Sequence, residues 1–242
     1  MASRIALIAL ALFAAVPAAA QERLDPEEEA GLLTDYEAHI RLVLADAFAP
    51  PVRLRAIVLH SFQTEYAVGL REGPGGYEIF SLRPARQIWT YTMIEMMRQG
   101  AVRASDLQGR DITASEIERQ AEGLPADPAD LPLARCSVAV DDALAGALLA
   151  AWRVMLLEVR PRRAPIDGLD GVTYRFSTES DGRMLSGQTW SPRENTRPAR
   201  LARIAEVMRS HCERPNPAYV ALMRRLADRL VRPAARRRPS LR

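Results

Sequence analysis

The stretch that decides the fold reads VRLRAIVLH at residues 52–60 and YAVGLREGPGGYEIFSL at residues 66–82. Apolar residues alternate with other residues along much of both segments, and this period of two is typical of strands that bury one face. A glycine-rich run at residues 73–76 interrupts the second segment and has the composition of a tight turn. The stretch therefore predicts an antiparallel meander.

Two later segments add strands to this β region. Residues 133–140 alternate in the same way and predict a short strand. Residues 171–190 contain two alternating runs on either side of Ser180-Asp181-Gly182, which predicts a β-hairpin. Residues 86–99 combine β-branched and aromatic residues with helix formers, and this mixture leaves strand and helix open.

Helix signals flank these strands. Asp25, followed by Pro26 and an acidic run, predicts the start of a helix. A largely apolar helix is predicted over residues 141–160, and another over residues 197–212. The sequence thus predicts the α+β fold class, with a mostly antiparallel sheet and these two helices packed on one of its faces.

The first 20 residues predict a cleavable signal peptide. Arg4 supplies a positive charge, residues 5–16 are uniformly apolar, and small residues precede Gln21. The apolar run is shorter than the roughly 20 residues of a spanning helix, although an uncleaved membrane anchor is the alternative. We expect a periplasmic or secreted chain that starts at Gln21, has a single domain over residues 21–232 and has no transmembrane segment after signal cleavage.

Cys136 and Cys212 are the two cysteines of the chain. Two cysteines far apart in sequence usually form a disulfide in an oxidising compartment, so we predict this bond. A catalytic thiol is the alternative. His211 precedes Cys212 directly, however, and neighbours on a helix point in different directions.

Arginine supplies all 33 basic residues, and the absence of lysine excludes lysine Schiff-base chemistry. Guanidinium groups suit phosphate or carboxylate recognition, but a base-composition bias of the genome is the simpler explanation for arginines that are scattered along the chain. Residues 222–242 hold eight arginines and one aspartate, a net charge of +7. We predict a disordered Arg-rich tail at residues 233–242, with possible contact to an anionic surface and no nucleic-acid partner.

Residues suited to catalysis are sparse. Histidine occurs only at positions 39, 60 and 211, none has a partner at metal-ligand spacing, and we predict no metal site and no cofactor. His60, Ser61 and Glu65 are the residue types of a hydrolase triad. Adjacent strand residues face opposite sides of a sheet, so His60 and Ser61 are not expected to meet.

The candidate ligand-binding residues belong to the hairpin and are Asp170, Tyr174, Gln188 and Trp190. The last three share even positions with Phe176, which predicts one aromatic and polar face across the two strands. Such a face could bind a sugar or a peptide. The alternative is that the face packs on the predicted buried helix, with Trp152 behind it.

Several short motifs lie in this half of the chain: Trp152-Arg-Val-Met-Leu-Leu157, Arg160, Gly168-Leu-Asp-Gly171, Tyr174-Arg-Phe-Ser177 and Gly187-Gln-Thr-Trp-Ser-Pro192. Over roughly residues 136–212 the pattern resembles an uncharacterised family of exported, periplasmic bacterial proteins of unknown function. The resemblance implies an α+β envelope protein and brings no activity and no catalytic residues with it.

Two functions remain open. The leading hypothesis is a non-catalytic envelope protein that binds an envelope protein or a cell-wall component. The alternative is a cell-wall or polysaccharide hydrolase that uses Asp170 and a second carboxylate, such as Glu158 or Glu179, as its acid and base. Two carboxyl groups about 5–10 Å apart in a cleft would favour the enzyme.

Overall fold

The computed structural model describes residues 22–27, 34–99, 119, 121–161 and 170–232. Its strands form one six-stranded sheet in the order β4-β3-β2-β1-β5-β6, and every neighbouring pair is antiparallel. The predicted α+β class is confirmed. The strands are β1 (Val52–His60), β2 (Tyr66–Gly73), β3 (Gly76–Pro84), β4 (Leu133–Val140), β5 (Val172–Ser180) and β6 (Arg183–Trp190).

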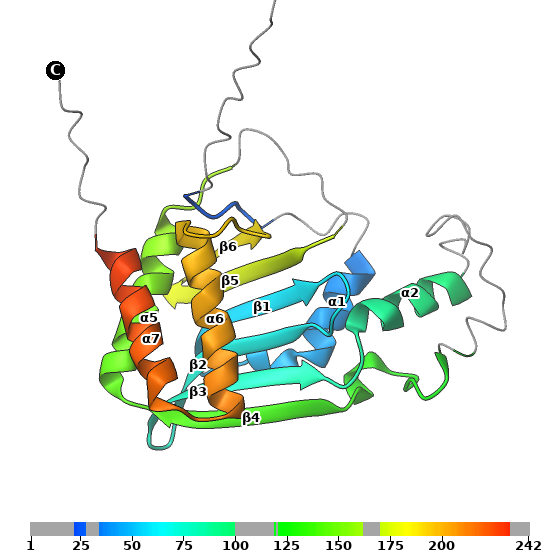
Figure 1. The fold of residues 1–242 in the computed structure, drawn as a ribbon. Coiled ribbons are helices and arrows are strands. Elements are labelled where there is room, and N and C mark those ends of the chain that lie inside the picture. The colour runs from blue at the N-terminus through cyan, green and yellow to red at the C-terminus, as the bar shows by residue number, and fades with distance from the viewer. Residues whose placement is uncertain (1–21, 28–33, 100–118, 120, 162–169, 233–242) are drawn as a thin grey trace, which may run out of the picture.

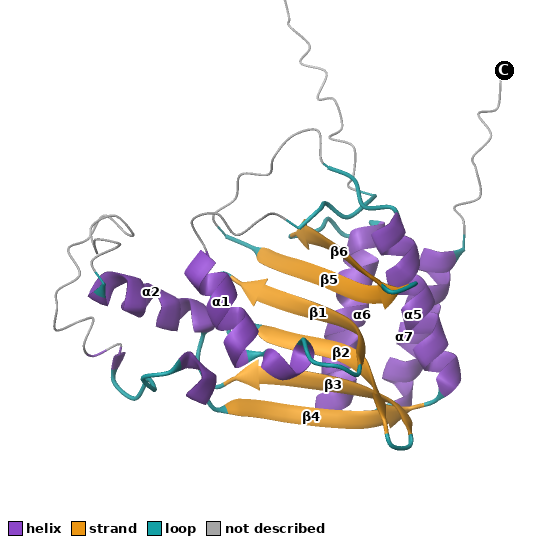
Figure 2. Cartoon of the chain, turned by 180° about the vertical axis from the view of Figure 1, so that it is seen from behind, coloured by secondary structure: helices purple, strands orange, loops and turns teal. Residues whose placement is uncertain are grey.

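The described helices lie at both faces of this sheet (Figures 1 and 2). The short 3-10 turns η2 (Ala45–Ala47) and η3 (Pro128–Asp130) accompany them. The ambiguous segment at residues 86–99 is helical. The helices are α1 (Thr34–Val43), α2 (Ile88–Arg98), α5 (Asp142–Leu157), α6 (Arg197–Glu213) and α7 (Pro217–Val231).

One face of the sheet carries α5, α6 and α7, as predicted for the segments at 141–160 and 197–212 (Figure 1). Polar residues before each helix cap it: Asp141 accepts a hydrogen bond from the Leu144 N–H, and Thr196 accepts one from the Ala199 N–H. The fully buried Trp152 of α5 packs in this layer and donates from its indole N–H to the Arg55 carbonyl.

The opposite face carries α1 and a second apolar core, which a sheet covered by helices on one face alone would lack (Figure 2). The central strand β1 shows why, because Ala56 and Val58 face the first core while Ile57 and Leu59 face the second. Both sets are buried. The sheet is therefore a middle layer, and the expected pattern of helices on one face is incomplete.

The predicted helix start at Asp25 is wrong. Asp25 forms an isolated antiparallel bridge with Gln188 of β6, through backbone hydrogen bonds of 2.8 and 2.7 Å. The neighbouring Leu24 is fully buried in the first core. These contacts protect part of the β6 edge and hold Asp25 in an extended conformation despite its helix-capping sequence.

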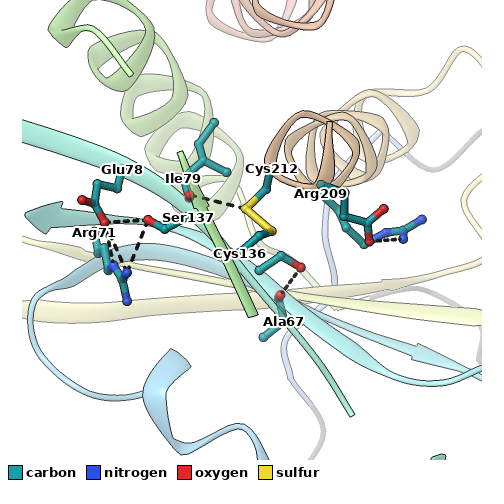
Figure 3. The surroundings of a disulfide bond; sticks show 10 residues. Ala67, Arg71, Glu78, Ile79, Cys136, Ser137, Arg209 and Cys212 are labelled. Atoms are coloured by element: carbon teal, nitrogen blue, oxygen red, sulfur yellow. Dashed lines mark hydrogen bonds and ion pairs between the residues drawn. A yellow bond between two sulfur atoms is a disulfide. The ribbon is translucent and has the colours of Figure 1, made fainter. Parts of the chain in front are cut away.

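Cys136 of β4 and Cys212 of α6 form the predicted disulfide, with Cα atoms 5.8 Å apart (Figure 3). The bond lies beside Ile79 of β3, whose carbonyl oxygen is 3.7 Å from the Cys212 sulfur. It fastens the end of α6 to the outermost strand of the sheet. Helix α6 is thereby fixed at one end by a covalent bond.

Several predictions fall outside the described residues. These are the signal peptide at residues 1–20 and the Arg-rich tail at residues 233–242. Within the described ranges, no helix combines the length and apolar character needed to cross a membrane.

Candidate functional site

The hairpin does not bring its four even-numbered residues onto one face. Tyr174 pairs with Thr189 and Phe176 with Gly187, whereas Gln188 pairs with Arg175. Directly paired residues of antiparallel strands share a face, so Tyr174 and Phe176 lie on one side of the sheet and Gln188 and Trp190 on the other. The prediction of a shared aromatic and polar face is wrong.

The turn explains the error. Ser180 pairs with Arg183, which leaves Asp181 and Gly182 as a two-residue loop. Their φ angles of 53° and 70° are both in the left-handed region, as a type I′ turn requires. A two-residue loop pairs even positions on β5 with odd positions on β6. Parity can be compared across strands only after the length of the loop is known.

Tyr174 and Phe176 point towards the helices, and the alternative of packing against Trp152 is confirmed for this pair. The Trp152 and Phe176 rings meet edge to face at 5.7 Å, and the Tyr174 ring is stacked with Phe176 at 6.2 Å. Phe176 is completely buried, whereas the Tyr174 hydroxyl donates a hydrogen bond to Glu206 of α6.

Gln188 and Trp190 lie on the α1 side of the sheet and are half-buried. Their neighbour Arg175 forms an ion pair with Glu37 of α1. The Trp190 ring lies against Gly171, where an added Cβ would come within 2.6 Å of the indole nitrogen. Trp190 therefore has a packing role next to the start of β5.

Of the carboxylates proposed for a hydrolase, Asp170 and Glu179 lie too far apart to act as an acid–base pair. Glu158 is ion-paired with Arg197 of α6. Asp170 precedes β5 and Glu179 lies near its other end, so the extended strand separates them by about 30 Å. This distance is far larger than acid–base catalysis across one glycosidic bond allows.

His60, Ser61 and Glu65 have separate roles. The Ser61 hydroxyl donates to the Gly171 carbonyl and accepts from the Gly171 N–H, both at 3.0 Å. His60 packs beside the Tyr66 ring with centroids 6.0 Å apart. Glu65 is completely buried and accepts hydrogen bonds from the Tyr36 hydroxyl and from the backbone N–H groups of Ile88 and Trp89. These three residues do not form a triad.

An open cleft of about 580 Å³ lies where the start of β5, the segment after β6, α6 and α7 meet. Tyr174 is the predicted site residue that lines it. Apolar side chains from three of these elements, Val172, Pro192 and Leu226, form part of its wall. The remaining lining is strongly polar and consists of Ser191, Glu194, Asn195, Arg200, Arg203, Glu206 and Arg229, with Ala199 and Ala202 between them.

Hydrogen bonds organise the wall that α6 contributes. Glu206 accepts from the Tyr174 hydroxyl at 2.8 Å through one carboxylate oxygen and from Arg203 at 2.8 Å through the other. Arg200 donates to the backbone carbonyl of Asn195 at 2.9 Å. The rim is therefore partly pre-organised by bonds within the protein.

Burial, followed by the hydrogen bond and the negative charge of Glu206, raises the pKa of Tyr174 above its ordinary value. The hydroxyl therefore stays protonated at physiological pH and remains a donor to Glu206. The bonded pair is a fixed polar feature beside the arginines rather than a group that exchanges protons near neutrality.

Sequence reasoning missed Arg200, Arg203, Glu206 and Arg229. The first three follow one another at intervals of three residues on α6, a spacing that places them along one side of a helix. That stripe was detectable. Its meeting with Arg229 of α7 and Tyr174 of β5 depends on tertiary packing, which the sequence pattern does not specify.

Among the described residues, no group of three or more His, Cys, Asp or Glu side chains could hold a metal ion. Comparisons of the chain with models of protein families, with curated proteins and with solved structures found no match.

Proposed function

We propose that this chain is an exported, non-catalytic protein of the bacterial envelope, and that it binds an envelope component through the cleft between β5, α6 and α7. The cleft carries the proposal, because its volume of about 580 Å³ is in the range of sites for small ligands or for one end of a larger molecule. Its walls combine apolar surface with fixed polar groups, which is the usual composition of a binding site.

Two observations support the place of action. The first 20 residues have the sequence of a signal peptide, and the Cys136–Cys212 disulfide suits an oxidising compartment. The resemblance of residues 136–212 to exported envelope proteins agrees with this assignment. The separation of Asp170 from Glu179 does not favour a hydrolase that uses this pair.

Export is tested by producing the full chain in a bacterium with a periplasm and measuring the intact mass of the protein from each cell fraction. We expect the periplasmic fraction to contain a chain that starts at Gln21 and is two hydrogens lighter than the dithiol. A full-length chain in the membrane fraction would instead support the uncleaved anchor.

Cleft-dependent binding is tested by co-sedimentation of the mature protein with isolated peptidoglycan sacculi and, separately, with envelope membrane vesicles. Ala199→Trp fills part of the cleft without changing its charge, and Ala143→Trp on the exposed start of α5 is the matched control. We expect the wild type and the control to sediment with one of the two preparations and Ala199→Trp to remain in solution. Sedimentation of all three proteins, or of none, would contradict the proposal.

A further inference from the structure

We propose that the cleft recognises an oxyanion, a carboxylate or a phosphate, that is carried on a short apolar group. This inference rests on the proposed binding function and specifies the chemistry of the ligand. Three features of the cleft support it. Arg200 and Arg229 have unused hydrogen-bond donors, Glu206 is already bonded to other side chains, and part of the wall is apolar.

The arginines retain most of their donors. Arg229 has no hydrogen bond or ion pair with the part of the chain that the structure describes, and Arg200 uses one terminal nitrogen for the Asn195 carbonyl. A guanidinium carries five N–H donors in a fixed fork that matches two oxygens of a carboxylate or phosphate. Arg200 and Arg229 come from different helices, so an anion between them would be held from two sides.

The carboxylate of Glu206 already has hydrogen-bond partners within the protein. Glu206 accepts from both Tyr174 and Arg203, which leaves Glu194 as the second acidic side chain of the lining. Glu194 is exposed and forms no ion pair with a described residue. The lining therefore contains three guanidinium groups and two carboxylates. The cleft has an excess of positive charge, although residues 21–221 together carry a net charge of −5.

The apolar wall limits the rest of the ligand. Val172, Pro192 and Leu226 offer a surface for a short hydrocarbon or side chain next to the arginines. Burial of such a group adds affinity that an inorganic anion alone would lack. The ligand class is thus an amphipathic anion. Its head group is an oxyanion, either a carboxylate or a phosphate.

Calorimetric titration of the mature protein with hexanoate, pentyl phosphate and hexanamide tests this inference, because the three probes share one five-carbon apolar chain. We expect at least one anion to bind about tenfold or more tightly than the neutral amide, as charge-assisted hydrogen bonds predict. The anion with the higher affinity identifies the head group.

Variants connect the affinity to the cleft. Arg200→Gln and Arg229→Gln should each weaken anion binding by about tenfold, whereas Arg225→Gln, an exposed arginine of the same helix as Arg229, should leave it unchanged. Glu194→Gln should strengthen binding, because it removes a negative charge from the lining.

Two results would overturn the inference. Equal affinity for hexanamide and the anions would reject the anionic class while leaving a binding function in place. Absence of anion binding at millimolar concentration would also reject it, and the co-sedimentation of wild type and Ala199→Trp would then decide separately whether the proposed function stands.

Discussion

Glu65 shows how a single buried side chain organises a whole element. Its carboxylate accepts hydrogen bonds from the Tyr36 hydroxyl at 2.9 Å and from the first backbone N–H groups of α2, at Ile88 (2.9 Å) and Trp89 (2.8 Å). The N-terminus of α2 has no capping side chain of its own, since Gln87 makes no such bond. A carboxylate from the β1–β2 connection therefore satisfies donors that the helix leaves open.

We expect Glu65→Gln to lower the free energy of unfolding by about 2–3 kcal/mol, because one amide oxygen must replace two charged acceptors in a buried position. Glu72→Gln is the control: its 3.5 Å ion pair with Arg53 is exposed, and its removal should cost less than about 1 kcal/mol. Urea unfolding of both variants measures the difference. Equal losses at the two positions would contradict the anchoring role.

The sequence predicted some individual residues well, but it did not predict which distant side chains contact each other. The Cys136–Cys212 pair could be predicted because the chain has two cysteines and its first 20 residues predict export to an oxidising compartment. Tyr174 lines the cleft, and its role in binding a ligand stays a prediction. Its hydrogen bond to Glu206 joins side chains 32 positions apart, and no local pattern contains that information.

Among the elements, periodicity predicted most of the architecture. The structure contains the hairpin, the strand at residues 133–140 and the helices predicted over residues 141–160 and 197–212, where alternation and helical spacing indicated them. The wrong predictions concern the contacts between elements. The faces of β5 and β6 depended on a two-residue turn, and the Asp25 segment paired with a strand edge.

The disulfide gives the prediction that belongs to this scale. Cys136→Ala combined with Cys212→Ala should lower the free energy of unfolding by about 4 kcal/mol, because the cross-link spans 76 residues and restricts the unfolded chain. Urea unfolding of the double variant and of reduced wild-type protein should give the same decrease. If the oxidised wild type is no more stable than either of them, the bond between β4 and α6 has no stabilising role.

For the molecule as a whole, the cleft belongs to the layer that α5, α6 and α7 form on one face of the sheet. The α5–α7 layer buries Phe176 and the centre of the sheet, and the start of β5, α6 and α7 line the open cleft at one end of this layer. The disulfide fixes the far end of α6, on β4. Arg200 and Arg203 therefore project from a helix whose position is set at its opposite end.

The three histidines make the stability of the whole molecule depend on pH. Burial is the first cause that lowers the pKa of His39, His60 and His211 below the ordinary value of 6.5. His211 also accepts a hydrogen bond from the Asn216 N–H through Nδ1, which requires that nitrogen to be unprotonated.

Below pH 6.5 the unfolded chain takes up protons that the folded histidines still exclude, so the free energy of unfolding should decrease as the pH falls from 7 towards 5. Burial raises the pKa of Glu27, and this group acts in the opposite direction. We expect a lower melting temperature at pH 5 than at pH 7. His211→Asn, which places an acceptor near the position of Nδ1, should reduce that difference, and a melting temperature that is constant or rises towards pH 5 would show that the folded histidines are not shielded from protonation.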